Sequence, residues 1–313
     1  MKAIKPYAEI FEEKDVLKKI EVCGRVCYKS EDKITDGSAE RFVANIIKRG
    51  HEAVLEHASF IFEIEKYLKM YFENTILWLE EHTNFESYLR FTSDGRYIVS
   101  GTVRAWREFV KYTLKVRGVL PEAFKDFIFE NPVLFPEYQD EEMFALSDFG
   151  VMKKLSISDL ATIGEKLTHW DVTAKFVVDR GISHEIVRHR PASYCQESTR
   201  YCNYSKDGFG GEITCIIPYY LEEGTVGMCI WKKSMKNAES DYFDLLDFGL
   251  SPQEARGVLP TSLKTELMMT ANLGEWKHFF DLRTTVAAHP QVREVAIPLS
   301  KEFPVIFDGD VNE

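Results

Sequence analysis

The sequence has no long apolar run and no surplus of positive charge. None of its apolar stretches approaches the roughly 20 residues that a membrane-spanning helix needs. Its 313 residues carry 39 lysines and arginines against 50 aspartates and glutamates, so the net charge is −11. Nucleic-acid-binding proteins usually present a broad basic face. These absences argue against a membrane protein and, more mildly, against a nucleic-acid-binding protein.

Common cofactor and targeting motifs are missing as well. No Gly-x-Gly-x-x-Gly follows a strand-like segment, and no cysteine pair has a second cysteine or histidine pair at zinc-ribbon spacing. The first residues lack the apolar stretch of a secretory signal. We therefore interpret the six cysteines as free thiols, predict no metal site, and expect a cytoplasmic protein.

The composition is that of a globular protein with a large core. Hydrophobic residues make up 45% of the chain and aromatic residues 13%, which is enough for one large domain or two smaller ones. Strand and helix patterns mix without regular strand–helix–strand alternation, which indicates an α+β fold with a mixed or antiparallel sheet flanked by helices. Strands are expected over residues 58–64, 173–178 and 213–217, and a loop over residues 119–150. Helices are expected over residues 15–28, 38–50, 67–90, 102–116, 179–188, 233–246, 252–257, 261–271 and 274–287.

The densest polar cluster lies at residues 188–201. Three arginines, one histidine and three serine or threonine hydroxyls fall within thirteen positions. Pro191 ends the preceding helix or holds its exit extended, so a loop is expected to follow it. Guanidinium and hydroxyl groups together suit a phosphate. From the residues alone, a solvated basic helix end paired with Glu185 and Glu197 explains the cluster equally, and a nucleic-acid patch is a further alternative.

Three blocks of sequence carry a resemblance to a known family. The first is Arg188-His189-Arg190 followed after seven residues by Ser198, within a match of roughly fourteen positions. The second is the histidine-containing segment 51–57, and the third comprises residues 255–260, 270–272, 278–279 and 282–283. In order and spacing these blocks resemble the flavin-dependent thymidylate synthases. Residues from about 66 to 172 do not resemble the shorter members of that family.

The resemblance implies a reaction, cofactors and an assembly. The family transfers a carbon from methylenetetrahydrofolate to dUMP, giving dTMP, with NADPH-reduced FAD as the reductant. The reaction needs no covalent enzyme nucleophile, and no Pro-Cys pair occurs here. The resemblance further implies the thymidylate synthase-complementing fold and a homotetramer with shared active sites. We expect one catalytic domain over residues 1–313, with a family-variable extension at about 66–172.

By the same resemblance, dUMP is held by two segments of the chain and by a C-terminal arginine. Arg283 is expected against the uracil carbonyl and N3, as the catalytic residue. Its structural alternative is a surface helix arginine. The residues expected to bind dUMP are Glu185, Arg188, Gln196, Glu197, Ser198, Thr199, Arg200, Arg256 and Arg283.

FAD is expected to contact residues from all three blocks. Those implied by the resemblance are Ala53, Arg188, His189, Arg190, Gln196, Asn272, Gly274 and His278, with His51, Glu56 and His57 near the flavin or folate. Structural alternatives remain: Asn272 as a helix cap, His278 as a core residue, and His51 and His57 as residues that order their loop. The sequence departs from several members of the family: some have an acid at the position of Gln196, arginine is frequent at that of Gly274, and asparagine occurs in some at that of His278.

Two other functions remain open at this point. A non-catalytic nucleotide- or RNA-binding protein would use the basic cluster together with Tyr194, Tyr201 and Tyr204. Another flavoenzyme on the same scaffold would oxidise NADPH without methylating dUMP. Bound flavin separates the first of these from a thymidylate synthase, and dUMP dependence separates the second.

Overall fold

The computed structural model describes residues 1–82, 88–145, 150–205 and 210–303. Its central feature is a four-stranded sheet in the order β10-β12-β9-β2, with every neighbouring pair antiparallel. The strands are β2 (Tyr7–Phe11), β9 (Asp171–Asp179), β10 (Ser193–Gln196) and β12 (Lys264–Asn272). β12 and β9 pair over nine residues, from Lys264 opposite Asp179 to Asn272 opposite Asp171. This ladder fixes the spacing of segments that are distant in sequence.

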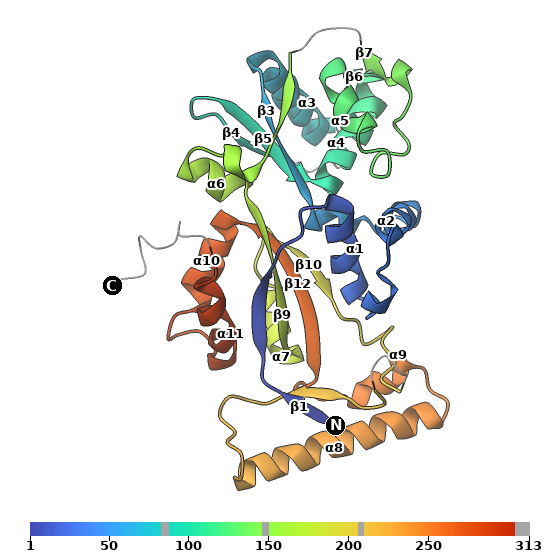
Figure 1. Cartoon of the computed structure of the whole chain (residues 1–313), viewed down its shortest axis with the longest axis vertical. Coiled ribbons are helices and arrows are strands. Elements are labelled where there is room, and N and C mark those ends of the chain that lie inside the picture. The colour runs from blue at the N-terminus through green and yellow to red at the C-terminus, as the bar shows by residue number, and fades with distance from the viewer. Residues whose placement is uncertain (83–87, 146–149, 206–209, 304–313) are drawn as a thin grey trace.

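Helices cover both faces of this sheet (Figure 1). On one face α7 (Arg180–Ile186), α10 (Leu273–Arg283) and α11 (Pro290–Ser300) enclose a core that contains Phe176, Leu267 and Trp276. On the other face α1 (Val16–Val26) packs Cys23 and Val26 against Cys195 and Met268. Because both faces are covered, β12 is buried almost without alternation along its length.

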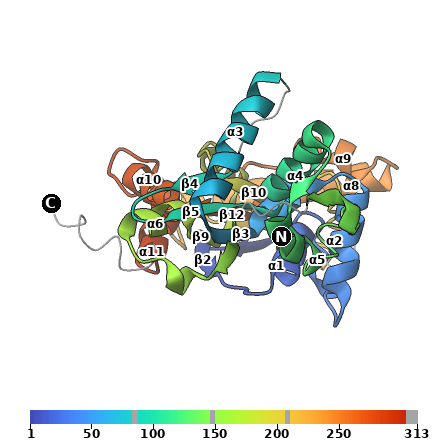
Figure 2. The ribbon, with the colours of Figure 1, turned by 90° about the horizontal axis from the view of Figure 1, so that it is seen from above.

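A second sheet lies above the central sheet in Figure 1, towards one end of the molecule's long axis. Its order is β4-β5-β3-β8, again antiparallel, with β3 (Ser59–Ile64), β4 (Arg90–Thr92), β5 (Tyr97–Thr102) and β8 (Met152–Leu155). Around it lie α3 (Lys66–His82), α4 (Val103–Arg117), α5 (Lys125–Phe129) and α6 (Ile163–His169). An aromatic core joins Phe62, Phe72, Trp106 and Phe124, and it is continuous with residues of α1 and of α2 (Ser38–Lys48). Seen from above, α3 projects away from the other helices (Figure 2).

The remaining elements are shorter pairs and a long helix. β1 (Lys2–Ile4) pairs in parallel with β11 (Thr214–Ile216), and β6 (Leu120–Pro121) with β7 (Phe144–Ala145). α8 (Val226–Asp247) lies at the end opposite the second sheet, next to α9 (Pro252–Ala255) (Figure 1). In the described ranges no helix combines the length and the apolar character needed to cross a membrane.

The expected α+β class, with antiparallel sheets flanked by helices, is confirmed. Several boundaries also agree, because local capping determines them: Asp15 caps α1, Thr102 caps α4, and Gly118 ends α4 with φ 78°. Residues 83–87 of the helix expected at 67–90, and residues 146–149 of the expected loop, lie outside the described residues.

Three expectations about secondary structure are wrong. The helix expected over residues 261–271 is the strand β12. The segment after Pro191 is the strand β10, where a loop was expected. Residues 51–57, also expected as a loop, contain a 3-10 helix at Glu52–His57. In the first two cases pairing within the sheet overrides the local preference of the residues.

Candidate active site

Arg283 is held at the end of α10 by two residues that α7 positions. Its Nη1 donates to Glu185 Oε2 at 2.8 Å, its Nη2 to the Glu185 carbonyl at 3.3 Å, and its Nε to His189 Nε2 at 2.8 Å. A guanidinium has five N–H donors. Two of them therefore remain available for a ligand, on a cation whose orientation the protein has already fixed.

His189 is neutral in this arrangement. Its Nε2 accepts a hydrogen bond from Arg283, so that nitrogen carries no proton. Burial, together with the charges of Arg283 and His278, lowers the pKa of His189 to about 4. The ring packs against Phe279 with centroids 4.8 Å apart, which fixes its plane. A neutral, immobile histidine keeps Arg283 directed at one position.

The lowered pKa values of three buried histidines predict how stability depends on pH. Burial lowers the pKa of His57 to about 3 and those of His169 and His189 to about 4. In the unfolded chain these histidines have pKa values of about 6.5, so between the folded and unfolded pKa values the unfolded chain binds more protons than the folded chain. The free energy of unfolding is therefore highest above about pH 6.5 and falls as the pH drops towards 4, by up to about 1.4 kcal/mol per pH unit for each histidine.

Urea unfolding from pH 7 to 5 measures this slope. His57→Gln should flatten it, and substitution of the exposed His278 is the control; equal slopes for both variants would contradict the assignment.

A second group of the expected residues surrounds residues 198–200. The Ser198 amide donates to the Cys27 carbonyl at 3.1 Å, which anchors the segment to the end of α1. Arg256 Nη1 donates to Thr199 Oγ1 at 3.4 Å, and Arg200 Nε donates to Gln253 Oε1 at 3.2 Å. Arg200 and Arg256 are exposed, so two guanidiniums lie at the surface beside the partly exposed Ser198, whereas Thr199 is buried. That is a suitable arrangement for a phosphate.

Glu197, expected beside the nucleotide, points inward. Its side chain is 1% exposed and forms an ion pair with Lys264 at 2.8 Å. Lys264 also pairs with Glu266 at 2.8 Å, and Glu266 further pairs with Lys29 and with Lys175, the latter at 2.8 Å. We call these five residues the Glu266 network. Sequence reasoning missed it, because a helix over residues 261–271 would have placed Lys264 and Glu266 on different faces.

Among the residues expected to bind FAD, two are exposed arginines and one forms hydrogen bonds within the protein. Arg188 and Arg190 are exposed, and Arg190 lies over the Tyr194 ring at 5.0 Å. Gln196 donates to Ser183 Oγ at 2.9 Å and Thr265 Oγ1 at 3.2 Å.

Three other residues expected to bind FAD lie at or near the start of α10. Asn272 caps the helix by accepting from the Glu275 amide at 2.8 Å, as its structural alternative supposed. A Cβ at Gly274 would lie 3.3 Å from both Asn272 Oδ1 and the Leu167 carbonyl, which is close contact. His278 is exposed and therefore is not a core residue.

The four expected residues of the segment 51–57 have different environments. His51 and Ala53 are exposed and line a pocket. Glu56 pairs with Arg104 at 2.7 Å and accepts from Ser193 Oγ at 2.9 Å. His57 is completely buried, with its Nδ1 2.7 Å from Thr270 Oγ1, which fits a residue that orders the segment.

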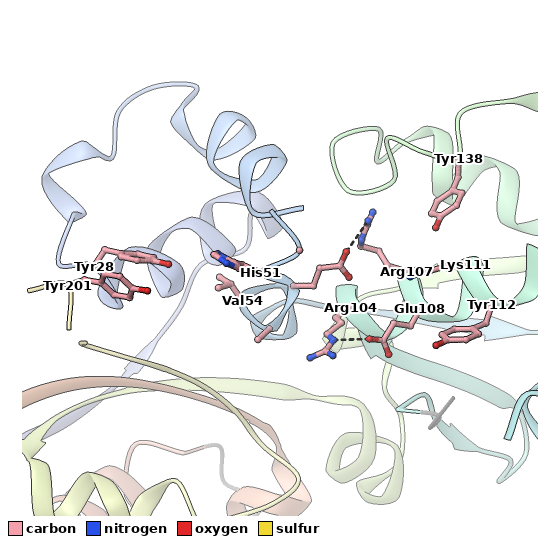
Figure 3. Close-up of a pocket in the computed structure, with 13 residues that line it drawn as sticks. Tyr28, His51, Val54, Arg104, Arg107, Glu108, Lys111, Tyr112, Tyr138 and Tyr201 are labelled. Carbon is pink, nitrogen blue, oxygen red and sulfur yellow. Dashed lines mark hydrogen bonds and ion pairs between the residues drawn. The ribbon is translucent and has the colours of Figure 1, made fainter. Parts of the chain in front are cut away.

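Two neighbouring pockets meet at Tyr28, His51 and Tyr201. The first, of about 660 Å³, extends towards α4 and Tyr138 (Figure 3). The second, of about 600 Å³, extends over α1 and α2 and is lined by Arg25, Lys33, Arg41 and Arg49. The Tyr28 and Tyr201 rings are 5.3 Å apart at the shared edge. Both volumes lie in the range of small-molecule sites.

The structure thus gathers the expected residues into separate groups: Arg283 with Glu185 and His189, residues 198–200 with Arg256, and His51 with Ala53. No hydrogen bond or ion pair between described side chains connects Arg283 with residues 198–200. Over the same ranges, no group of three or more His, Cys, Asp or Glu residues is arranged to hold a metal ion.

The family model described as thymidylate synthase complementing protein matches residues 10–68 and 160–307. This chain belongs to that family. The matched ranges contain all the groups just described, and they leave out residues 69–159, which build α4, β4, β5 and β8.

Curated relatives and solved structures give partial matches. A flavin-dependent thymidylate synthase of Pyrococcus furiosus is 37% identical over 124 residues, which cover 40% of this chain and 50% of the relative. One of Thermococcus kodakarensis is 31% identical over 170 residues, covering 53% and 68%. The chain spans about half the length of the first relatives it matches.

Among solved structures, the UMP/dUMP methylase PolB of Streptomyces cacaoi bound with 5-Br UMP has a TM-score of 0.40 at 13% identity, covering 96% of this chain and 90% of that one. Thymidylate synthase X of Helicobacter pylori with FAD and dUMP has a TM-score of 0.35 at 20% identity, covering 44% and 68%.

Proposed function

We propose that this protein is a flavin-dependent thymidylate synthase, which methylates dUMP to dTMP with methylenetetrahydrofolate as carbon donor and NADPH as reductant. The observation that carries the proposal is the fixed guanidinium of Arg283. Glu185 and His189 orient it while two of its N–H groups stay available. A cation placed in advance against a uracil carbonyl stabilises negative charge that develops on the ring.

The nucleotide's phosphate would be bound by residues 198–200 and Arg256. Arg200 and Arg256 offer guanidiniums, the partly exposed Ser198 adds a hydroxyl group, and the buried Thr199 hydroxyl accepts from Arg256. Because Arg256 already donates to Thr199, these side chains are close enough to bind one anion together. In this proposal the buried Glu197 anchors residues 198–200 through its ion pair with Lys264 and does not contact the nucleotide directly.

The chain's residues suit FAD. Arg188 and Arg190 present exposed guanidiniums that fit a diphosphate, and Gly274 adds no side chain at the start of α10. We infer that these residues, together with Ala53, Gln196 and His278, hold the cofactor. When bound, FAD would carry reducing equivalents from NADPH to the pyrimidine. The chain's own residues position the substrates, exclude water and stabilise charge.

A covalent route through Cys195 is disfavoured. Its side chain is buried, and its hydrogen bond with Cys27 together with burial raises the pKa of the Cys195 thiol well above the usual range. A thiol held in its protonated form is a poor nucleophile. This supports a reaction driven by polarisation of the ring.

We infer that the active protein is a cytoplasmic homotetramer whose sites combine several chains. Within one chain, Arg283 and residues 198–200 belong to separate groups of contacts. A site that uses both to hold one nucleotide is therefore most simply completed by a second copy. The matched family supports this assembly by resemblance.

Tritium release from dUMP labelled at C5 tests the proposal directly. With NADPH, methylenetetrahydrofolate and FAD, we expect release together with dTMP formation, and little of either without FAD. NADPH oxidation without tritium release or dTMP formation would identify a different flavoenzyme. A purified protein that takes up no flavin and binds oligonucleotides in a salt-sensitive manner would refute the proposal.

A further inference from the structure

The pocket of about 660 Å³ has one wall that the family-matched residues do not provide. His51, Ala53 and Val54 of the matched region lie opposite Arg104, Arg107 and Lys111 of α4. In Figure 3, Tyr28 and Tyr201 lie at one end of this pocket, and Tyr112 and Tyr138 at the other. The pocket therefore exists in this form only because residues 69–159 are present.

The α4 wall is fixed to the segment 51–57 by ion pairs. Arg107, 5% exposed, pairs with Glu52 at 3.2 Å and with Glu137 at 3.0 Å, and it also donates to the Leu134 carbonyl. Arg104 joins Glu56 at 2.7 Å and Glu108 at 2.9 Å. Contacts of this kind hold the two sides at a constant separation, so the pocket is formed before any ligand arrives.

The charges of the pocket favour an anion. The residues that line the pocket include three cations, Arg104, Arg107 and Lys111, and two carboxylates, Glu52 and Glu108. Both arginines are already held in ion pairs. Lys111 is exposed and lines the same wall, and it has no ion-pair partner in the described part of the chain. It contributes at longer range to lowering the pKa of Glu137, whose carboxylate Arg107 already binds. An acidic group of a ligand would complete the pairing of Lys111.

The rings of the pocket favour a flat ligand. Tyrosines 28, 112, 138 and 201 and the imidazole of His51 all line it. Aromatic side chains bury planar ligands at a low cost in conformational entropy. The ammonium group of Lys111 beside these aromatic walls fits a heteroaromatic molecule with an anionic tail.

We propose that residues 69–159 complete a co-substrate pocket in which Lys111 binds the anionic tail of a heteroaromatic ligand while the tyrosines hold its planar part. This rests on the proposed function, which supplies two such ligands: a folate with glutamate carboxylates and a nicotinamide dinucleotide with phosphates. The shared chemistry is an aromatic ring system joined to several negative charges.

Binding measurements on the flavin-loaded full chain test the proposal apart from turnover. The ligands are tetrahydrofolate with one glutamate, tetrahydrofolate with three glutamates, and NADPH, each titrated into wild type, Lys111→Ala and Lys111→Glu. Lys115→Ala is the matched control, because it removes the same charge one turn further along α4 outside the pocket lining. We expect Lys111→Ala to weaken one ligand by roughly fivefold and Lys111→Glu to weaken it more.

The outcomes separate the two ligand sources and the two proposals. A loss that grows with the number of glutamates assigns the tail to folate, whereas a loss confined to NADPH assigns it to phosphate. If both Lys111 variants bind all three ligands like Lys115→Ala, the pocket proposal is overturned, even when tritium release is normal. Absence of tritium release from wild type would instead refute the proposed function, and the titrations would still decide whether Lys111 binds an anionic ligand.

Discussion

Replacing Arg283 with alanine should reduce dTMP formation by about 10² to 10³-fold, the usual effect of removing one fixed group that stabilises charge in a transition state. The guanidinium is oriented by three hydrogen bonds, to the carboxylate and carbonyl of Glu185 and to His189. Arg283→Lys should lose most of the activity too, because an ammonium group cannot reproduce this planar set of donors.

The measurement is tritium release at saturating dUMP, with the oligomeric state followed by size-exclusion chromatography. Lys277→Ala on the same helix is the control, since Lys277 forms a partly exposed i, i+4 ion pair with Asp281. The tetramer should survive in both variants. Near-normal turnover of Arg283→Ala would remove the residue from the mechanism.

Glu266→Gln should be among the most destabilising single substitutions in the chain, costing about 3 kcal/mol of unfolding free energy. Burial opposes ionisation of Glu266, yet Lys264, Lys175 and Lys29 hold the pKa of its carboxyl well below the usual range. The amide would leave three ammonium groups close together without their shared counter-charge.

Urea unfolding at pH 7 compares this variant with Glu73→Gln. Glu73 also pairs with a lysine, Lys69, but its side chain is 48% exposed. A surface pair of this kind contributes about 0.5 kcal/mol or less. Similar losses in the two variants would mean that the Glu266 network adds no more than ordinary surface charge.

The sequence was most informative where structure is determined locally. Capping by Asp15 and Thr102, and the left-handed turn at Gly118, each depend on a few adjacent residues, so those helix ends could be predicted. The basic cluster at residues 188–201 was visible for the same reason. The roles assigned to the expected site residues stay predictions, because testing them requires bound ligands.

β12 shows where such reasoning fails. Its residues Leu267, Met268 and Met269 are good helix formers, and all are buried because the sheet is covered on both faces. Without alternation there is no strand signal to detect. The Glu266 network could not be predicted either, because Lys29, Lys175 and Lys264 are brought together only by the tertiary fold. The same holds for the co-substrate pocket, in which Tyr28 and Lys111 are far apart in the sequence.

The position of β3 makes the extension inseparable from the rest of the chain. β3 belongs to the family-matched region, yet both of its neighbours, β5 and β8, come from residues 69–159. A shortened protein without that insert would leave β3 with two open edges, and Phe60, Phe62 and Ile64 would lose their cover. Such a strand is a template for self-association. Trimming the gene to the size of the compact relatives would therefore give aggregates, and substitutions at single positions are the better way to study the insert.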